Sequence, residues 1–323
     1  MERGKKDMNV LVYGAPYYEF QLATIVEGLQ ILGHKVYDIR KEGRNYMEPY
    51  NGEFIDLYID AFPHEKFSPK FNKPLTKIMI WPYDLAEDRS LLNYDEHIFD
   101  IAFVRDYDGK GPANVFPMNY GIEYRYFCAG IETNKSLVKR EYDITYLAAL
   151  CVGERREYLR VIEKYFADKN LLIGDKGTLI NEADPYWSQW VNGIFTHNND
   201  YYRALANSKI IISTRGGGPE CGRIYEAIAS HALPLTEYRQ TIQVPPVLEE
   251  AIPEIFFKGP EEMVEKTNLF LNDLEYAQAV ADKVYDFGKN YLLSKHRVIY
   301  ILTKLMEVKG GLIRSDVSQN KTN

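Results

Sequence analysis

The sequence predicts an α/β fold built from two parallel-sheet domains, on the basis of three observations. Short apolar runs alternate with segments of helical periodicity along nearly the whole chain. The length of 323 residues exceeds the usual size of one domain, so two domains of about 150 residues each are expected. The alternation loses its regularity once, near the middle of the chain, and then restarts. These observations favour two consecutive Rossmann-like domains.

The first domain is expected to span residues 1–127. It opens with the run MNVLVYGAP, a buried strand that ends at Gly14, followed by a helical segment that stops at Gly33 and a second strand, KVYDI. Four more apolar runs follow: FIDLYIDAF, TKIMIWP, FDIAFV and NVFPMN. Each is closed by Pro, Asp or Gly, which is typical of a parallel sheet with its loops gathered at one end.

Residues 128–141 lose periodicity and are predicted to form a linker, and residues 142–287 are predicted to form the second domain. The predicted strands of this domain are YDITYLAAL, NLLIGD, KIIIST, ALPLTEY and EIFFKG, with amphipathic helical segments between them. A long helical stretch closes the chain, with a break expected near Gly288. We expect residues 309–323 to form a flexible tail.

Composition and charge indicate which partners and which compartment to expect. The net charge is −7 and the longest basic cluster is the initial ERGKK, so no basic stripe indicates nucleic acid as a partner. The three cysteines are far apart and lack paired metal spacing, which favours a reducing compartment. No window resembles a signal-peptide core or a membrane span, so we expect a cytoplasmic protein without a transmembrane segment.

No metal or other cofactor is expected. None of the six histidines shares ligand spacing with another. The Asp106–Asp108 pair has the D-x-D pattern that holds a divalent cation against a nucleotide diphosphate in one class of transferase. We reject this pair as a metal site, because the pattern is frequent by chance and a glycine-rich loop elsewhere supplies positive charge.

That loop lies in the stretch IIISTRGGGPECGRIYEAIASHALPL, residues 210–235. A β-branched strand runs into Gly216, Gly217 and Gly218, and a helix is expected to begin near Glu220 to Gly222. Ligands of open parallel sheets bind beyond the carboxyl ends of the strands, where glycines permit positive φ and close backbone approach, and helix N-termini attract anions. The stretch therefore predicts a diphosphate site.

Charged side chains in the same stretch fit this interpretation. The guanidinium groups of Arg215 and Arg223 are expected to make bidentate hydrogen bonds to phosphate oxygens. The carboxylate of Glu226, one helical turn after Arg223, is expected to accept hydrogen bonds from two sugar or ribose hydroxyls. The alternative, with equal weight, is a glycine turn followed by an ordinary helix salt bridge between Arg223 and Glu226.

The segment RGGGPECGRIYEAIASHALPLTEY resembles the donor-binding segment of glycosyltransferases with the GT-B fold, in which a glycine-rich loop precedes a helix carrying R-x-x-E-A. It is similar to the group 1 family, especially its branch related to the spore maturation protein CgeB, and to the exostosin-like branch. Other segments, among them TKIMIWPYDLAED, FPMNYGIEYRYFC and YDITYLAALCVGERREYLRVIEKY, occur in the order of the CgeB-like family. The resemblance therefore covers most of the chain.

The resemblance implies two Rossmann-like domains facing across a cleft, with the helix of residues 288–308 packing back on the first. The second domain would bind a nucleotide-diphosphate sugar and the first an acceptor. Arg215 and Glu226 would take part in catalysis, and Arg156 is as consistent with a solvated charge as with a ligand. The implied donor-binding residues are Arg155, Gly174, Arg215, Gly216, Gly217, Gly218, Glu220, Gly222, Arg223 and Glu226.

Two positions depart from the family pattern. Group 1 sequences often carry a second glutamate eight positions before the first, but this chain has Gly218 there. The usual glycine after the E-A-x-A motif is His231. The retaining mechanism common in that family is therefore not assumed.

The acceptor side is expected on loops that follow strands of the first domain. An inverting transferase needs a base there, and we expect Asp84, with His64 and Glu19 as further candidates. Asp84 is also well placed to cap the helix around LAEDRSLL. Gly14 and Tyr17 would line the acceptor loop, which lacks the G-x-G-x-x-G fingerprint of dinucleotide binding.

The expected function is metal-independent transfer of a sugar from a nucleotide-diphosphate sugar to a hydroxyl of a glycan or another acceptor. Three alternatives remain: a non-catalytic nucleotide-sugar-binding protein, a sugar-nucleotide epimerase of the same fold, and a DNA-modifying glucosyltransferase. The negative net charge counts against the last of these.

Overall fold

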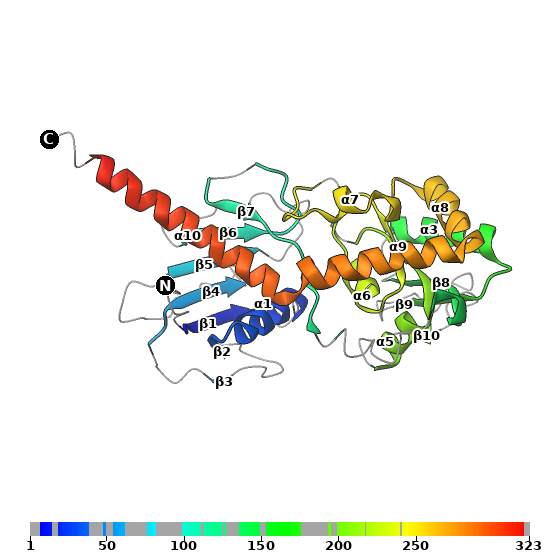
Figure 1. Cartoon of the computed structure of the whole chain (residues 1–323), viewed down its shortest axis with the longest axis horizontal. Coiled ribbons are helices and arrows are strands. Elements are labelled where there is room, and N and C mark those ends of the chain that lie inside the picture. The colour runs from blue at the N-terminus through cyan, green and yellow to red at the C-terminus, as the bar shows by residue number, and fades with distance from the viewer. Residues whose placement is uncertain are drawn as a thin grey trace. The chain divides into compact units, whose positions relative to one another are not determined.

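The computed structural model describes residues 7–14, 19–38, 48–49, 54–61, 76–81, 99–110, 113–124, 126, 136–148, 153–175, 193–194, 199–216, 218–239 and 241–319. The chain divides into two compact units. Unit 1 comprises Met1–Gly121, Thr241–Val244 and Leu293–Asn323, and unit 2 comprises Ile122–Gln240 and Pro245–Leu292. Figure 1 shows both units, coloured along the chain.

Unit 1 is built on a seven-stranded parallel sheet in the order β3-β2-β1-β4-β5-β6-β7. Val10 of β1 pairs with Val36 of β2 on one side and with Leu57 of β4 on the other. The strand order therefore reverses between β1 and β4. The strands are β1 (Asn9–Gly14), β2 (Lys35–Asp38), β3 (Glu48–Pro49), β4 (Leu57–Ala61), β5 (Thr76–Trp81), β6 (Ile101–Val104) and β7 (Val115–Pro117).

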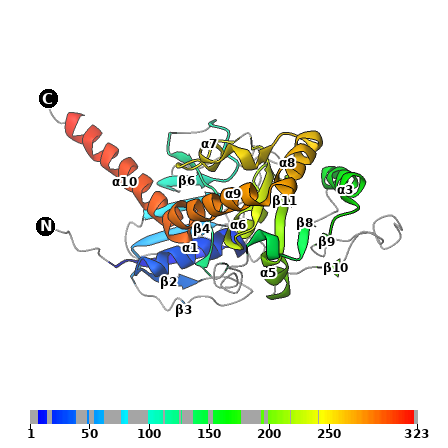
Figure 2. The same ribbon diagram turned by 45° about the vertical axis from the view of Figure 1, so that its right-hand side comes forward.

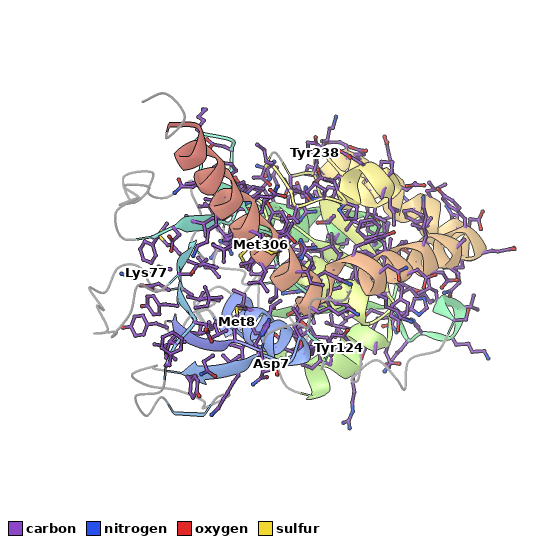
Figure 3. All side chains as sticks on the ribbon, turned by 60° about the vertical axis from the view of Figure 1, so that its left-hand side comes forward. Asp7, Met8, Lys77, Tyr124, Tyr238 and Met306 are labelled. Carbon is purple, nitrogen blue, oxygen red and sulfur yellow. The ribbon has the colours of Figure 1, made fainter. Side chains whose placement is uncertain are left out.

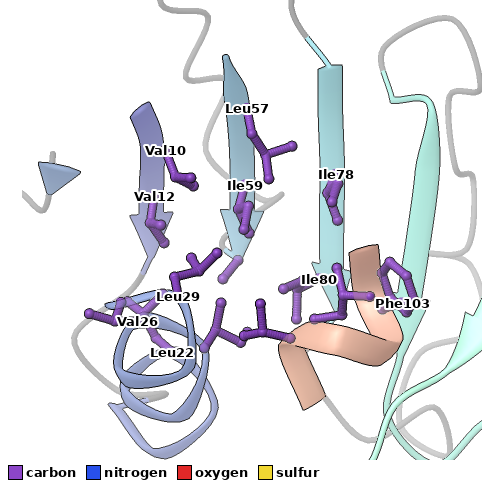
Figure 4. Packing of buried hydrophobic residues seen from close by; sticks show 14 of the residues in the cluster. Val10, Val12, Leu22, Val26, Leu29, Leu57, Ile59, Ile78, Ile80 and Phe103 are labelled. Carbon is purple, nitrogen blue, oxygen red and sulfur yellow. The ribbon is translucent and has the colours of Figure 1, made fainter. Parts of the chain in front are cut away.

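Two helices cover one face of this sheet, α1 (Glu19–Ile31) and α10 (Ser294–Gln319). Alternate strand residues face them, because side chains of a strand point to opposite faces in turn. The core they form is shown in Figure 4 and includes Val10, Val12, Ile59, Ile78 and Ile80 from the strands and Leu22, Val26 and Leu29 from α1. Val298 and Ile301 of α10 belong to the same cluster.

The two helices approach closely at Gly28. A β-carbon at this position would lie 2.5 Å from the backbone oxygen of Ser294 and 2.7 Å from Cγ2 of Val298. The hydroxyl of Ser294 also donates a 2.5 Å hydrogen bond to Glu27. Only glycine leaves room for this crossing.

Unit 2 is built on a six-stranded parallel sheet in the order β10-β9-β8-β11-β12-β13. Its order reverses between β8 and β11, which lie side by side in Figure 2. All five residues of β12 are buried, as expected for a strand covered on both faces. The strands are β8 (Tyr142–Ala148), β9 (Leu171–Asp175), β10 (Gly193–Ile194), β11 (Ser208–Ser213), β12 (Leu233–Glu237) and β13 (Phe256–Phe257).

The helices of unit 2 include α3 (Gly153–Phe166), α5 (Asn199–Ala206), α6 (Arg223–Ala229), α7 (Leu248–Ala251), α8 (Pro260–Asn272) and α9 (Leu274–Phe287). The break expected near Gly288 is confirmed: α9 ends there and a π-helical turn, Gly288–Leu292, follows. A β-carbon on Gly288 would lie 2.4 Å from Cγ2 of Ile228, so α6 and the turn pack in direct contact.

Buried Arg140 fixes the two segments that flank the glycine-rich loop. Its guanidinium donates to the backbone oxygens of Ser208 at 2.9 Å, Ser230 at 3.3 Å and His231 at 2.8 Å. Ser208 begins β11 and Ser230 follows α6. Burial lowers the pKa of Arg140 to about 10, and the three carbonyl oxygens satisfy its donors.

The strands and helices predicted within the described residues are confirmed, including the two-residue β13, whereas β3, β10 and α7 were not predicted. Helix α10 runs to Gln319 and so includes most of the expected tail. Figure 3 draws the described side chains, among them the exposed Met306 on α10. No helix in the described part of the chain combines the length and apolar character that a membrane span needs.

Candidate functional site

A pocket lies in unit 2 where the strand order reverses. In open parallel sheets the carboxyl ends of the strands at this point leave a crevice that helices do not fill. The pocket is partly open, and the space within its lining, open solvent included, is about 170 Å³. It is lined by Tyr146, Leu147 and Ala148 from the end of β8, Ile212, Ser213 and Thr214 from the end of β11, Arg155 from α3, and Cys221 and Arg223 at the start of α6.

Arg155 lies in the first turn of α3, and its guanidinium reaches across to the glycine-rich loop. Its Nε donates to the backbone oxygen of Arg215 at 2.8 Å, and its Nη2 lies 4.0 Å from Sγ of Cys221. The hydroxyl of Tyr146 donates to the backbone oxygen of Arg155 at 3.2 Å and shares a 2.9 Å hydrogen bond with Thr214. The position of Arg155 is therefore fixed by both strands that line the pocket.

Gly216 lies close to the end of this arginine side chain. A β-carbon there would lie 2.9 Å from Nη2 of Arg155. Among the described glycines, positive φ occurs at Gly33 and Gly109 and not in the loop. Our expectation of positive φ is thus wrong for Gly216, and close approach of a diphosphate to its backbone stays a prediction.

Arg223 and Glu226 form an ion pair inside the protein. Nε of Arg223 lies 3.3 Å from Oε2 of Glu226, and both side chains are buried. The hydroxyl of Tyr201 donates to the same carboxylate oxygen, and the ring of Tyr201 lies 5.8 Å from the guanidinium of Arg223. The i, i+3 pair that the sequence offered as an alternative is present, but in the interior and against an aromatic ring.

Burial raises the pKa of Tyr201 well above its ordinary value; the nearby Arg223 opposes this shift and the Glu226 carboxylate adds to it. The hydroxyl therefore keeps its proton and acts as a donor to Glu226. Nη1 of Arg223 has no hydrogen-bond partner among the described residues, although it is buried and its side chain lines the pocket. Such a group is a strong donor for an anion that enters.

Arg215 is partly exposed and pairs with Glu237 at the end of β12. Its backbone N–H donates to Glu237 at 3.0 Å and its Nε lies 3.2 Å from the other oxygen of that carboxylate. Its side chain is 38% exposed. Sequence reasoning missed Glu237, whose place at the end of β12 becomes informative only once β12 is known to neighbour β11.

Glu220 belongs to a buried network. It accepts hydrogen bonds from the hydroxyl of Tyr225 and, at 3.2 Å, from Nη1 of Arg239. Nε of Arg239 lies 3.2 Å from Glu249. Arg239 and Glu249 were also missed, because no local spacing links them to the glycine-rich loop.

The other expected donor-side positions are placed as follows. Gly174 lies in β9 and pairs with Leu147 of β8. The carbonyl of Gly218 accepts a 3.0 Å hydrogen bond from the N–H of Gly216, and Gly222 immediately precedes α6. Arg156 is half-buried. Gly217 lies outside the described residues.

On the expected acceptor side, Gly14 ends β1 beside the point where the sheet of unit 1 reverses its order. Glu19 is the first residue of α1. Tyr17, His64 and Asp84 lie outside the described residues. Within the described ranges, no group of three or more His, Cys, Asp or Glu side chains is arranged to hold a metal ion.

Two comparisons with known proteins relate this chain to glycosyltransferases. Residues 155–303 match a family described as glycosyl transferase-like, a range that begins at the pocket arginine Arg155 and ends within α10. No curated protein sequence matches the chain.

Solved structures with similar folds cover nearly the whole chain. One is an alpha-glucosyltransferase in complex with UDP-glucose and DNA containing an abasic site, with a TM-score of 0.66, 10% identity, and coverage of 93% of this chain and 100% of that chain. Another is Anabaena Alr3699/HepE in complex with UDP-glucose, with a TM-score of 0.59, 10% identity, and coverage of 95% and 100%. A third is WaaG, a glycosyltransferase involved in lipopolysaccharide biosynthesis, with a TM-score of 0.56, 10% identity, and coverage of 94% and 100%. The fold is therefore the GT-B fold of glycosyltransferases, with a Rossmann-like sheet in each unit.

Proposed function

We propose that the protein is a glycosyltransferase that moves a sugar from a nucleotide-diphosphate sugar to an acceptor hydroxyl. One observation carries the proposal: the pocket at the reversal point of the second sheet has two arginines, Arg155 and Arg223, in its lining. The GT-B fold and the glycosyl transferase-like match over residues 155–303 support it. The CgeB-like branch suggested by the sequence is part of the same proposal.

In this reaction the pocket arginines act on the diphosphate. Negative charge grows on the leaving diphosphate as its bond to the sugar breaks, and fixed cations in a buried site stabilise that charge. Arg155 is held by the backbone oxygen of Arg215, so it needs little reorganisation to meet a phosphate oxygen. Arg215, which is more exposed, is the expected third cation.

Glu226 is expected to contact hydroxyl groups of the donor. Tyr201 and Arg223 fix its carboxylate, which favours a defined orientation toward a ribose or sugar ring. We propose that the reaction is metal-independent, since guanidinium groups can supply the positive charge that a divalent cation supplies in other transferases. The acceptor is a glycan or another hydroxyl compound, with Asp84 as the proposed base.

A thermal-shift and binding screen tests the donor site. The full chain is incubated with UDP-, GDP-, dTDP- and CDP-sugars in the presence of EDTA, and the melting temperature is recorded. We expect one nucleotide class to raise it. Arg155→Gln should weaken that binding by roughly 10- to 100-fold, because a charge-assisted hydrogen bond contributes about 1.5–3 kcal/mol. Arg160→Gln on the exposed side of the same helix is the matched control and should bind like the wild type.

Product analysis then separates the alternatives. Release of the nucleoside diphosphate with a candidate acceptor supports transfer, and activity in EDTA supports metal independence. Binding without consumption of the donor would identify a non-catalytic binding protein, and conversion of the sugar without an acceptor would identify an epimerase. If no nucleotide sugar binds, the proposed function is wrong.

A further inference from the structure

A cysteine in the pocket has no part in the proposed transfer. Cys221 is half-buried, is not in a disulfide, and lines the pocket together with Arg155 and Arg223. Its Sγ lies 4.0 Å from Nη2 of Arg155. Arg223 is a second guanidinium in the same lining, and its side chain is buried.

A second, independent observation indicates that an anion fits beside this thiol. Nη1 of Arg223 is buried, lines the pocket and lacks a hydrogen-bond partner among the described residues. Oγ of Ser213, the last residue of β11, is likewise buried and has no hydrogen-bond partner in the described part of the chain. Buried donors of this kind gain free energy when an anionic ligand satisfies them.

These surroundings have a definite consequence for the thiol. The thiolate is the nucleophilic form of cysteine, and neighbouring arginines favour it over the thiol. The same positive charge attracts anionic reagents and raises their local concentration. Cys221 therefore combines a thiol beside a guanidinium with a site for the anionic group of an incoming reagent.

We propose that Cys221 is a modification site that undergoes thiol–disulfide exchange with anionic low-molecular-weight disulfides of the glutathione disulfide class. The thiol first loses its proton to solvent. The Cys221 sulfur then attacks one sulfur of the disulfide, the reagent's S–S bond breaks, and a new bond joins Cys221 to that half. The other half leaves as a thiolate and takes up a proton, so the incoming disulfide is the oxidant and one equivalent of thiol is released.

The mixed disulfide would occupy the pocket that the proposed function assigns to the donor diphosphate, and this regulatory consequence rests on that function. Modification would block nucleotide-sugar binding, and reduction by a thiol would restore it. The exchange itself depends only on the pocket and its arginines.

Reagent charge provides the first test. Full-length native protein is treated with the anionic 5,5′-dithiobis(2-nitrobenzoate) and, separately, with uncharged 2,2′-dithiodipyridine, and peptide mapping locates the label. We expect Cys221 to be labelled before Cys128 and Cys151. The ratio of anionic to uncharged rates should exceed that of the urea-unfolded chain by about tenfold, and salt should reduce it.

Single-residue variants test whether Arg155 causes the faster reaction of Cys221 with the anionic reagent. Cys221→Ser should abolish the fast phase, and Arg155→Gln should slow the anionic reagent by roughly fivefold more than the uncharged one, since a charge near 4 Å is removed. Arg160→Gln should change neither rate. The ratio of the anionic to the uncharged reagent's rate is measured on the wild-type protein, so this test holds even where a variant fails to fold. Labelling of another cysteine first, or a ratio equal to that of the unfolded chain, overturns the proposal.

The last experiment separates this inference from the proposed function. Protein treated with glutathione disulfide, and then with dithiothreitol, is tested for binding of the nucleotide sugar found in the screen. Loss and recovery of binding in the wild type, but not in Cys221→Ser, is expected. A chain that binds no nucleotide sugar yet keeps the fast anionic exchange would refute the proposed function and retain the modification site. Unaltered binding after complete labelling of Cys221 would refute the regulatory consequence.

Discussion

Single arginines determine where the carboxylates around the candidate site lie. Arg223 holds Glu226 from one turn away in the same helix, whereas Arg239 holds Glu220 and Glu249 from outside the glycine-rich loop. The side chains of Arg223, Arg239 and Glu220 are nearly inaccessible to water. Removing a partner from such a pair leaves a buried charge uncompensated, which costs far more than breaking a surface pair.

Replacement of Arg239 by methionine should therefore destabilise unit 2 strongly. We expect a loss of about 3–5 kcal/mol in the free energy of unfolding, measured by urea denaturation, because two carboxylates lose their cation. Lys283→Met is the matched control: its ammonium lies 3.5 Å from Glu254 in an exposed pair, and its loss should cost about 0–1 kcal/mol. Equal effects of the two substitutions would show that the Arg239 network does not stabilise the fold.

The residues around the candidate site show which single-residue roles could be predicted from the sequence and which could not. Arg223 and Glu226 were found because they are three positions apart in an expected helix, and their pairing was foreseen as an alternative. Arg239 and Glu237 were not found, since their partners are brought near only by strand pairing and loop packing. Gly216 was singled out partly for positive φ, which it does not have, and it lies instead against the guanidinium of Arg155.

At the scale of elements, the contact between α1 and α10 depends on one absent side chain. Gly28 lets the backbone of α10 approach so closely that even a methyl group would overlap Ser294 and Val298. Backbone atoms cannot move aside as the end of a flexible side chain can, so the helices must separate when the position is filled.

Gly28→Ala should lower the melting temperature of the protein. Overpacking of this kind costs about 1–3 kcal/mol, more than the roughly 0.5–1 kcal/mol that alanine gains over glycine inside a helix. Gly310→Ala provides the control, because its β-carbon would meet nothing within 4 Å. That substitution should leave stability unchanged or raise it slightly. A Gly28→Ala protein as stable as wild type would mean that α1 and α10 adjust without loss of packing.

Most elements were predictable because parallel strands buried on both faces appear as short runs dominated by apolar residues. β4 and β6, for example, are buried at every position and correspond to the runs FIDLYIDAF and FDIAFV. β3 (Glu48–Pro49) and β10 (Gly193–Ile194) lack the apolar run that made the equally short β13 (Phe256–Phe257) predictable. α7 has four residues, which is too few for helical periodicity to appear.

At the scale of the whole molecule, both sheets have the same order of strands along the chain. Each places its first strand in the interior, adds two strands on one side, and then crosses to the other side. Sequence reasoning predicted two such units from the restart of the alternation. The carboxyl ends of β8 and β11 could be assigned as the site only because their adjacency follows from this order.

The composition of unit 1 from three separate chain segments has a consequence for how the protein is made. Synthesis delivers β1 and α1 first, with Leu22, Val26 and Leu29 of α1 exposed, and delivers α10, which covers them, after all of unit 2. We expect unit 2 to become protease-resistant first in chains arrested on the ribosome, and protection of β1 before α10 emerges would contradict this. Because the ribosome adds about 5–20 residues each second, the apolar face of α1 waits roughly 15–50 seconds for its partner helix. The nascent chain is therefore a natural client for chaperones during that interval, even though the finished protein covers the same face completely.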